Sequence, residues 1–184
     1  VGEGNPSGKL ADTFAKRLED YPSSENFHES EDYVDYTDDI YVGYRYFETI
    51  PQAADKVNYP FGYGLSYTRF SLGMPLAEQK GDQIEITVSV SNTGDVPGKE
   101  VVQVYFSAPQ GRLGKPAKEL IAFRKSRLLA PGETQNMTLR FRVNDMASYD
   151  DLGKIARAAY VLERGEYSFY VGTSVRDVAA AEFR

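Results

Sequence analysis

Paired carboxylates are the feature of this chain that comes nearest to a catalytic or metal-binding site. Two such pairs, Glu31/Asp32 and Asp38/Asp39, lie within residues 19–39, which hold nine acidic side chains and no lysine or arginine. Acid–base catalysis needs one carboxyl group with a raised pKa, which burial supplies and a solvated acidic run does not. The spacing also differs from an EF-hand loop, whose turn glycine is missing. We therefore expect an irregular, solvated surface segment without a catalytic or metal-binding role.

Three other features resemble parts of known sites but lack the remaining parts. His28 is the single histidine, and no serine or cysteine pattern accompanies it, so a catalytic triad is not expected. Ser66 lacks the second glycine of a Gly-x-Ser-x-Gly elbow. The Gly62-Tyr63-Gly64 pattern lacks the third glycine and the following helix of a nucleotide-binding loop. The sequence thus predicts no catalytic residue, no metal ligand and no cofactor.

The composition excludes several classes of protein. The 184 residues include no cysteine, so disulfides and thiolate metal sites are excluded, and one histidine cannot form a multi-histidine centre. A formal net charge of −6 argues against a nucleic-acid-binding protein. No apolar run is long enough for a transmembrane helix, and residues 1–30 show no signal-peptide pattern. We expect neither nucleic acid nor a membrane among the partners, and a solvated basic loop at Arg112, Lys115 and Lys118.

The second half of the chain has the pattern of an antiparallel β-sandwich. Residues 83–91 alternate strictly, with Ile84, Ile86, Val88 and Val90 on one face, and end at an Asn-Thr-Gly turn. Further extended runs separated by glycine and proline turns are expected at residues 101–106, 119–129, 137–143 and 167–171. A helical turn is expected only within residues 144–155. Several short strands at this spacing predict a sandwich of about 100 residues.

The first 66 residues, the N-terminal arm, lack such periodicity and are rich in aromatic side chains. A short segment cannot bury that many rings alone, so we expect them to pack against another surface. The candidate docking residues are Tyr41, Tyr44, Arg45, Tyr46, Phe47, Phe61, Tyr63 and Tyr67. A soluble monomer rarely exposes a large apolar patch, so the arm should fold back onto the sandwich or pair with a second copy. We favour self-association, because extended arms exchange readily between identical chains.

Six motifs along the chain resemble those of one enzyme family. In the arm they are NPSGKL at residues 5–10, YVGYRYF at 41–47 and FGYGLSYT at 61–68. In the second half they are VSNTG at 90–94, GKEVVQVY at 98–105 and PAKEL at 116–120. In this order and spacing they are similar to the motifs of glycoside hydrolase family 3, the β-glucosidase family. Ala11 and Ala15 stand where that family usually carries proline.

The resemblance implies a mainly β chain without the catalytic machinery. Family members place a (β/α)8-like barrel first, an α/β sandwich module second and a fibronectin type III-like module third. Their nucleophile is a barrel aspartate beside a tryptophan, and this chain has no tryptophan. Their acid/base glutamate lies upstream of the NPSG segment. The expected domains are residues 1–66, the tail of the α/β module and a linker arm, and residues 67–184, the fibronectin-like sandwich of immunoglobulin-like type.

The sequence is consistent with two functions. The chain is expected to be a C-terminal fragment of a β-glucosidase-like enzyme, inactive alone, that braces the catalytic modules of a parent enzyme hydrolysing β-glucosidic bonds with retention. The alternative is a stand-alone fibronectin-like module that binds carbohydrate or protein, with the tyrosine-rich stripe stacking on sugar rings. The compartment is not determined by the sequence, and the resemblance suggests the bacterial cytoplasm or periplasm.

Overall fold

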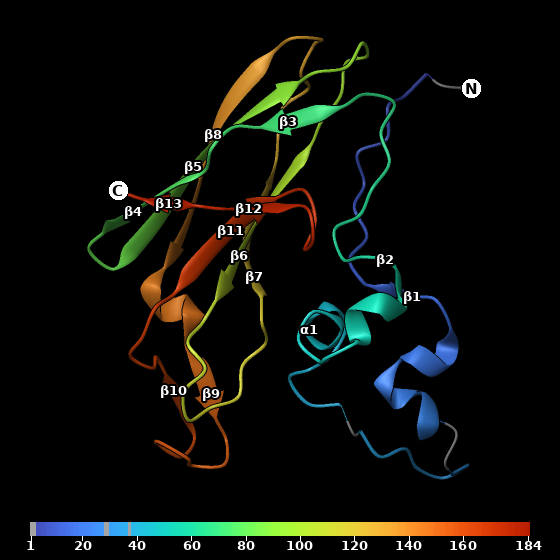
Figure 1. Cartoon of the computed structure of the whole chain (residues 1–184), viewed down its shortest axis with the longest axis vertical. Coiled ribbons are helices and arrows are strands. Elements are labelled where there is room, and N and C mark those ends of the chain that lie inside the picture. Colours follow the sequence, from blue (N-terminus) through green and yellow to red (C-terminus); the bar gives the residue numbers. More distant parts are fainter. Residues whose placement is uncertain (1–2, 28–29, 37) are drawn as a thin grey trace.

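The computed structural model describes residues 3–27, 30–36 and 38–184. Two bodies lie side by side in Figure 1: a two-layered β-sandwich, and the N-terminal arm in blue and cyan beside it. The elements of the arm are β1 (Phe14–Ala15), η1 (Leu18–Asp20), η2 (Pro22–Glu25), α1 (Tyr44–Phe47), η3 (Ala53–Lys56) and β2 (Val57–Tyr59). Here η denotes a 3₁₀ helix.

Two hydrogen-bonded sheets form the sandwich. In one sheet, β3 (Phe70–Leu72) and β4 (Leu76–Lys80) pair with one edge of β5 (Gln83–Asn92), and β8 (Thr134–Arg142) pairs with its other edge. The short β13 (Glu182–Phe183) adds to β4 in parallel. The second sheet has the antiparallel order β12-β11-β6-β7, with β12 (Val178–Ala180), β11 (Ser168–Gly172), β6 (Val101–Ser107) and β7 (Glu119–Lys125). The predicted antiparallel β-sandwich is confirmed.

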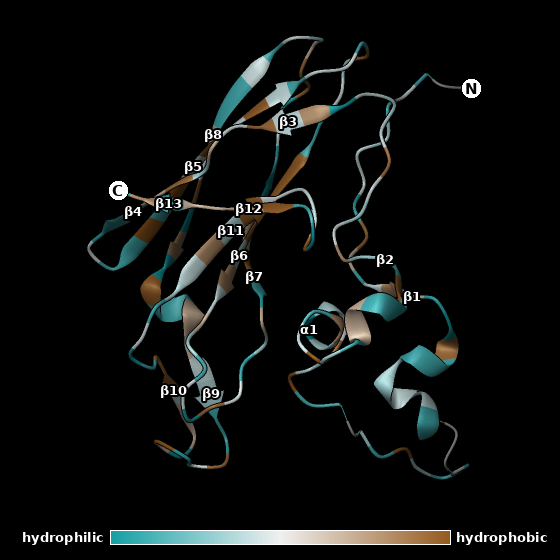
Figure 2. Cartoon of the chain, viewed as in Figure 1, coloured by the Kyte–Doolittle hydropathy of each residue, from teal (hydrophilic) through white to brown (hydrophobic). Residues whose placement is uncertain are grey.

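The core lies between the sheets and follows the predicted alternation. On β5, Ile84, Ile86, Val88 and Val90 are all buried; β8 adds core side chains beside them in the same sheet, and β6 and β11 contribute the facing side chains from the other sheet. In Figure 2, brown apolar segments are interspersed with teal polar ones along these strands. Fully burying a side chain of this size stabilises the fold by about 1.5–3 kcal/mol, so this two-residue period dictates which face of β5 points inward.

Strand β6 is buried on both faces, which a surface strand of a sandwich normally is not. Its even-numbered residues, including Val102 and Val104, belong to the core between the sheets. Its odd-numbered residues Gln103 and Tyr105 point the other way, yet they are only 3% and 0% exposed. The outer face of this sheet is therefore covered at β6, and the cover is the N-terminal arm, which contacts Tyr105 and Gln103.

Parts of the sandwich differ from the prediction. The run expected at residues 119–129 ends as a strand at Lys125, and the chain returns only as an isolated bridge between Leu129 and Gly98. The helical turn expected within residues 144–155 is the 3₁₀ helix η4 (Val143–Met146), followed by strand β9 (Ser148–Asp150), which pairs with β10 (Ala159–Val161). These strands are too short to show a period in the sequence.

The arm has a small core of its own. Phe47, Ala53 and Val57 are buried together, and β1 pairs with β2 across this cluster. The acidic segment contains η1 and η2, and its described residues from Asn26 to Ile40 form no helix or strand. His28 lies outside the described residues.

Candidate functional site

The arm contacts the sandwich along a surface that we call the seam. Gly43 enters α1 with a positive φ of 56°, and α1 then points Tyr44 at the outer face of β6. The Tyr44 ring lies 4.7 Å from Phe61 and 6.1 Å from Tyr105, measured between ring centroids. Burial raises the pKa of the Tyr105 hydroxyl well above its ordinary range. The aromatic side chains of the arm thus pack on a dry patch of the sheet.

Polar contacts surround this aromatic cluster. The Leu120 N–H donates a hydrogen bond of 2.9 Å to the Tyr44 hydroxyl. The Arg176 guanidinium pairs with the Glu48 carboxylate at 2.7 Å and donates to the Ala54 carbonyl at 2.9 Å. One backbone group on each side, the Leu120 N–H and the Ala54 carbonyl, is therefore satisfied by a side chain across the seam.

A glycine of the arm leaves room for a buried side chain of the sandwich. Gly62 has a φ of 82°, and a Cβ at this position would lie 2.4 Å from the Gln103 side chain. The neighbouring Phe61 carbonyl accepts a hydrogen bond of 3.1 Å from the Val175 N–H. Any larger residue at position 62 would have to displace the buried Gln103, so FGYGLSYT has a steric function at the seam.

The NPSGKL segment fastens the far end of the arm. Asn5 donates to the Pro97 carbonyl at 3.0 Å, and its Oδ1 accepts from the Ser66 hydroxyl at 2.9 Å and the Tyr67 N–H at 2.8 Å. Lys9 pairs with Glu100 at 2.8 Å, and both side chains are largely buried. Asn5 therefore joins the junction of arm and sandwich to the loop before β6.

The eight predicted docking residues separate into groups. Tyr44 and Phe61 lie in the seam, and Arg45 pairs with Glu119 of β7 at 3.3 Å. The rest have other surroundings: Tyr46 and Phe47 pack in the arm's own core, Tyr63 stacks on Tyr59, Tyr67 is 63% exposed, and Tyr41 lines a cavity. The arm is thus folded back on its own sandwich.

Several residues of the seam were missed from the sequence. Asn5 and Lys9 belong to a motif that had been noticed, but their partners are more than sixty residues away in the chain. Gln103 and Tyr105 gave a usable signal, because β6 has an almost continuously apolar sequence with no polar face. Such a strand is typical of a sheet covered on both sides.

The basic loop predicted to be solvated contains a buried lysine, which is a correction. Lys115 is 2% exposed; its ammonium group pairs with the Glu163 carboxylate and donates to the Pro109 carbonyl at 3.0 Å. The Glu163 carboxylate also accepts from the Arg112 N–H at 2.6 Å. The hydrogen bond from Lys115, with these backbone donors, holds the pKa of Glu163 below its ordinary value. The ion pair and the hydrogen bond offset the desolvation cost of burying the Lys115 ammonium group.

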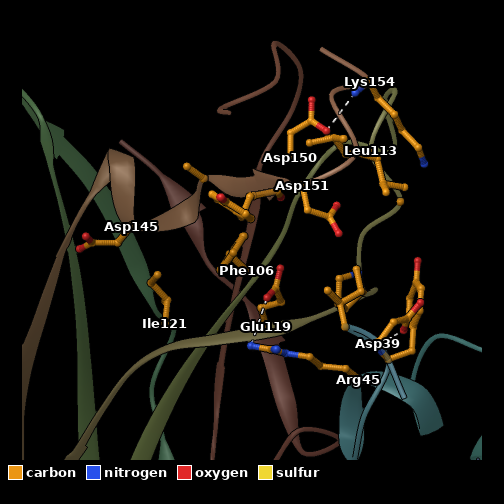
Figure 3. A pocket seen from close by; sticks show the side chains of 18 of the residues that line it. Asp39, Arg45, Phe106, Leu113, Glu119, Ile121, Asp145, Asp150, Asp151 and Lys154 are labelled. Carbon is orange, nitrogen blue, oxygen red and sulfur yellow. Dashed lines mark hydrogen bonds and ion pairs between the residues drawn. The ribbon is translucent and has the colours of Figure 1, made fainter. Parts of the chain in front are cut away.

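Beside the seam lies a cavity of about 810 Å³ with mixed polar and apolar walls. Figure 3 shows the Arg45–Glu119 pair on one side and Asp151 on the other. Asp39 and Tyr41 of the arm, the start of β7 and the β9 hairpin supply the remaining walls. Desolvation raises the pKa of the Glu119 carboxyl, although Arg45 opposes this shift.

Two classes of site are not found in the structure. Among the described residues, no group of three or more histidine, cysteine, aspartate or glutamate side chains could hold a metal ion. No helix in the same part of the chain is both long and apolar enough to cross a membrane.

Comparisons with known proteins agree with the geometry. A fibronectin type III-like domain family matches residues 100–175. The chain is 60% identical, over its whole length, to 24% of β-glucosidase A from Butyrivibrio fibrisolvens, and 50% identical, over 96% of its length, to 18% of a β-glucosidase from Ruminococcus albus. It thus spans about a quarter or less of these relatives.

Solved structures show the same likeness, which again includes the arm. A β-glucosidase from Paenibacillus barengoltzii superposes with a TM-score of 0.90 at 52% identity, over 98% of this chain and 20% of that one. A family 3 β-glucosidase from Bifidobacterium adolescentis gives 0.86 at 38% identity, over 98% of this chain and 26% of that one. The chain therefore corresponds, over almost its whole length, to the C-terminal portion of the β-glucosidases of glycoside hydrolase family 3, with its fibronectin type III-like domain.

Proposed function

We propose that this chain braces the catalytic modules of an enzyme that hydrolyses β-glucosidic O-glycosyl bonds with retention. The single observation that carries this proposal is the two-sided character of the arm. One side is attached to the sandwich along the seam, through contacts such as the Asn5–Pro97 hydrogen bond and the Glu48–Arg176 ion pair. The other side still exposes large apolar side chains, among them Phe14 at 51% and Leu65 at 69%. Such a surface is typical of a protein interface.

The exposed side is also hollowed. An apolar groove of about 490 Å³ is lined by Pro6, Leu10, Phe14, Tyr59, Tyr63 and Leu65, with Gly8, Lys9 and Gly64. Its position next to the NPSGKL segment supports an occupant that belongs to the same enzyme, because the chain spans at most about a quarter of its relatives. The partner we propose is the catalytic part of the parent enzyme.

Residues 1–66 and 67–184 then have separate roles. The arm would contact the catalytic modules, and the sandwich would hold the arm in one conformation through Tyr44, Phe61 and Gly62. Self-association through the arm is a second proposal. It would use Tyr67 and the groove, because Tyr44 and Phe61 already have partners within the chain. Light scattering at several concentrations distinguishes a monomer from a pair.

A stand-alone carbohydrate- or protein-binding module is less well supported. The tyrosine-rich stripe would have to present its rings to a sugar, but Tyr44 and Phe47 face inward. A free module also has no need of an arm fastened at both ends. The bracing function accounts for these contacts directly.

The test is binding between this chain and the rest of its enzyme, expressed separately. Leu65→Asp places a charge in the apolar groove and should weaken binding at least roughly tenfold. Phe123→Asp is the matched control, because Phe123 is 69% exposed on β7 of the sandwich. Equal binding by the wild-type chain and both variants, or no binding at all, would overturn the proposal.

A further inference from the structure

We propose that the cavity beside the seam binds a neutral saccharide of one or two sugar rings. The choice of a sugar rests on the proposed function, whereas the existence of the site rests on the geometry of the walls. The cavity measures about 810 Å³, within the range of about 300–1,000 Å³ that is usual for small-molecule sites.

The walls come from four separate segments of the chain. Asp39 and Tyr41 come from the arm, Leu113 from the loop after β6, Glu119 from β7, and Tyr149 from β9. Because the arm and the sandwich both supply walls, the cavity exists only while the arm is docked on the sandwich. The contacts of the seam therefore determine the shape of the cavity.

The charges that face the cavity favour a neutral ligand over an anion. Among the lining residues, Asp39, Glu119, Asp145, Asp150 and Asp151 carry carboxylates, and Arg45 and Lys154 carry cations; the Asp145 and Asp150 carboxylates are turned to backbone N–H donors of residues 142 and 153–156. The excess of carboxylates repels an anionic ligand. Most of these carboxylates already have donors: Glu119 pairs with Arg45, and Asp39 accepts from the Tyr41 N–H at 2.7 Å. Asp39 and Glu119 still have free acceptor positions, because an ionised carboxylate offers about four.

Sugar hydroxyls fit this set of partners. Each hydroxyl donates to a carboxylate and accepts from the Arg45 guanidinium or the Lys154 ammonium, so one ring can satisfy both kinds of group. The apolar face of a pyranose ring needs a flat apolar surface. Tyr149 supplies one, since it is 53% exposed and lines the cavity, with the Tyr160 ring 5.2 Å away between centroids and tilted by 60°.

The rim of the cavity is held in one conformation before any ligand arrives. Asp150 is fully buried, and its carboxylate accepts four backbone hydrogen bonds of 2.6–3.0 Å from residues 153–156. Figure 3 shows one of them, from Lys154, above Asp151. A fixed rim reduces the ordering cost of binding, so weak individual contacts add up to useful affinity.

The experiment titrates the complete 184-residue chain with cellobiose and follows its backbone amide resonances. We expect saturable shifts confined to residues of the cavity walls, with a Kd near about 1 mM. Glucuronate, which carries a negative charge, should bind at least roughly tenfold more weakly than glucose.

Two variants locate the binding in the cavity. Tyr149→Ala should weaken cellobiose binding roughly tenfold or more, and the milder Tyr149→Phe keeps the ring and should retain most of it. Phe123→Ala, on the exposed side of β7, is the control that should leave binding unchanged. Absence of saturable shifts at about 50 mM cellobiose, or equal binding by the Tyr149→Ala chain, would overturn the proposal. Because this titration omits the catalytic modules, its failure is distinct from a failure of the docking test.

Discussion

Replacing Tyr44 tests whether the arm is held to the sandwich by the contacts described above. Tyr44→Ala removes the ring that packs against Phe61 and Tyr105, together with the acceptor of the Leu120 N–H. Tyr44→Phe removes the acceptor alone. The pair of variants therefore separates the packing contribution from that of one hydrogen bond.

The expected magnitudes follow from these contacts. Truncating a fully buried aromatic side chain to alanine lowers the free energy of unfolding by about 3–5 kcal/mol. Tyr44 is only half-buried, so we expect Tyr44→Ala to lower it by about 2–3 kcal/mol. Tyr44→Phe leaves the Leu120 N–H without its acceptor and should cost about 1 kcal/mol. Tyr67→Ala, at a residue that is 63% exposed, should cost less than about 0.5 kcal/mol.

Urea unfolding followed by tyrosine fluorescence measures these differences, and limited proteolysis locates them. In the Tyr44→Ala chain, cleavage should become faster in the arm, and the sandwich should remain resistant. If Tyr44→Ala were no more destabilising than Tyr67→Ala, and the arm were cut no faster, the seam would not hold the arm and the reasoning would be refuted.

Three further predictions concern buried charges. Lys115→Met leaves Glu163 without its cation and should cost about 3–5 kcal/mol in urea unfolding, whereas K115M/E163M should recover part of that loss. Hydrogen bonding lowers the pKa of Glu163, so the ionised Glu163 carboxylate stabilises the fold fully above pH 4.5, the ordinary pKa, and this stabilisation disappears as pH falls through the lowered pKa. Glu163→Gln should therefore flatten this part of the curve of unfolding free energy against pH. Burial raises the pKa of Glu119, so its charge costs stability above that raised pKa; Glu119→Gln should stabilise the chain at pH 7 and lose the advantage in acid.

The sandwich was largely readable from the sequence because its signal is local. The period of β5 predicted its four buried residues and its end near Asn92, since each side chain's face follows from its position alone. The short strands β9 and β10 were missed for the opposite reason. They hold three residues each, and their pairing depends on the loop that Asp150 fixes.

The seam and the cavity depend on long-range contacts and were readable only in part. The aromatic content of the arm predicted a packing surface, and Tyr44 and Phe61 lie in it, but Phe47 packs within the arm itself. Lys115 was expected at the surface because its partner, Glu163, is 48 residues away. A neighbour at that separation leaves no local pattern.

The most direct test of the bracing function compares glucosidase turnover in three samples, with an aryl β-glucoside as substrate. We expect no turnover by this chain alone, and at least roughly tenfold faster turnover by the rest of the enzyme when the chain is added, equivalent to about 1.4 kcal/mol of barrier. The Leu65→Asp chain should increase the turnover of the remaining modules less than the wild-type chain does. Turnover by the isolated chain that an acidic-residue substitution abolishes, or equal activity of the remaining modules with and without the chain, would contradict the account.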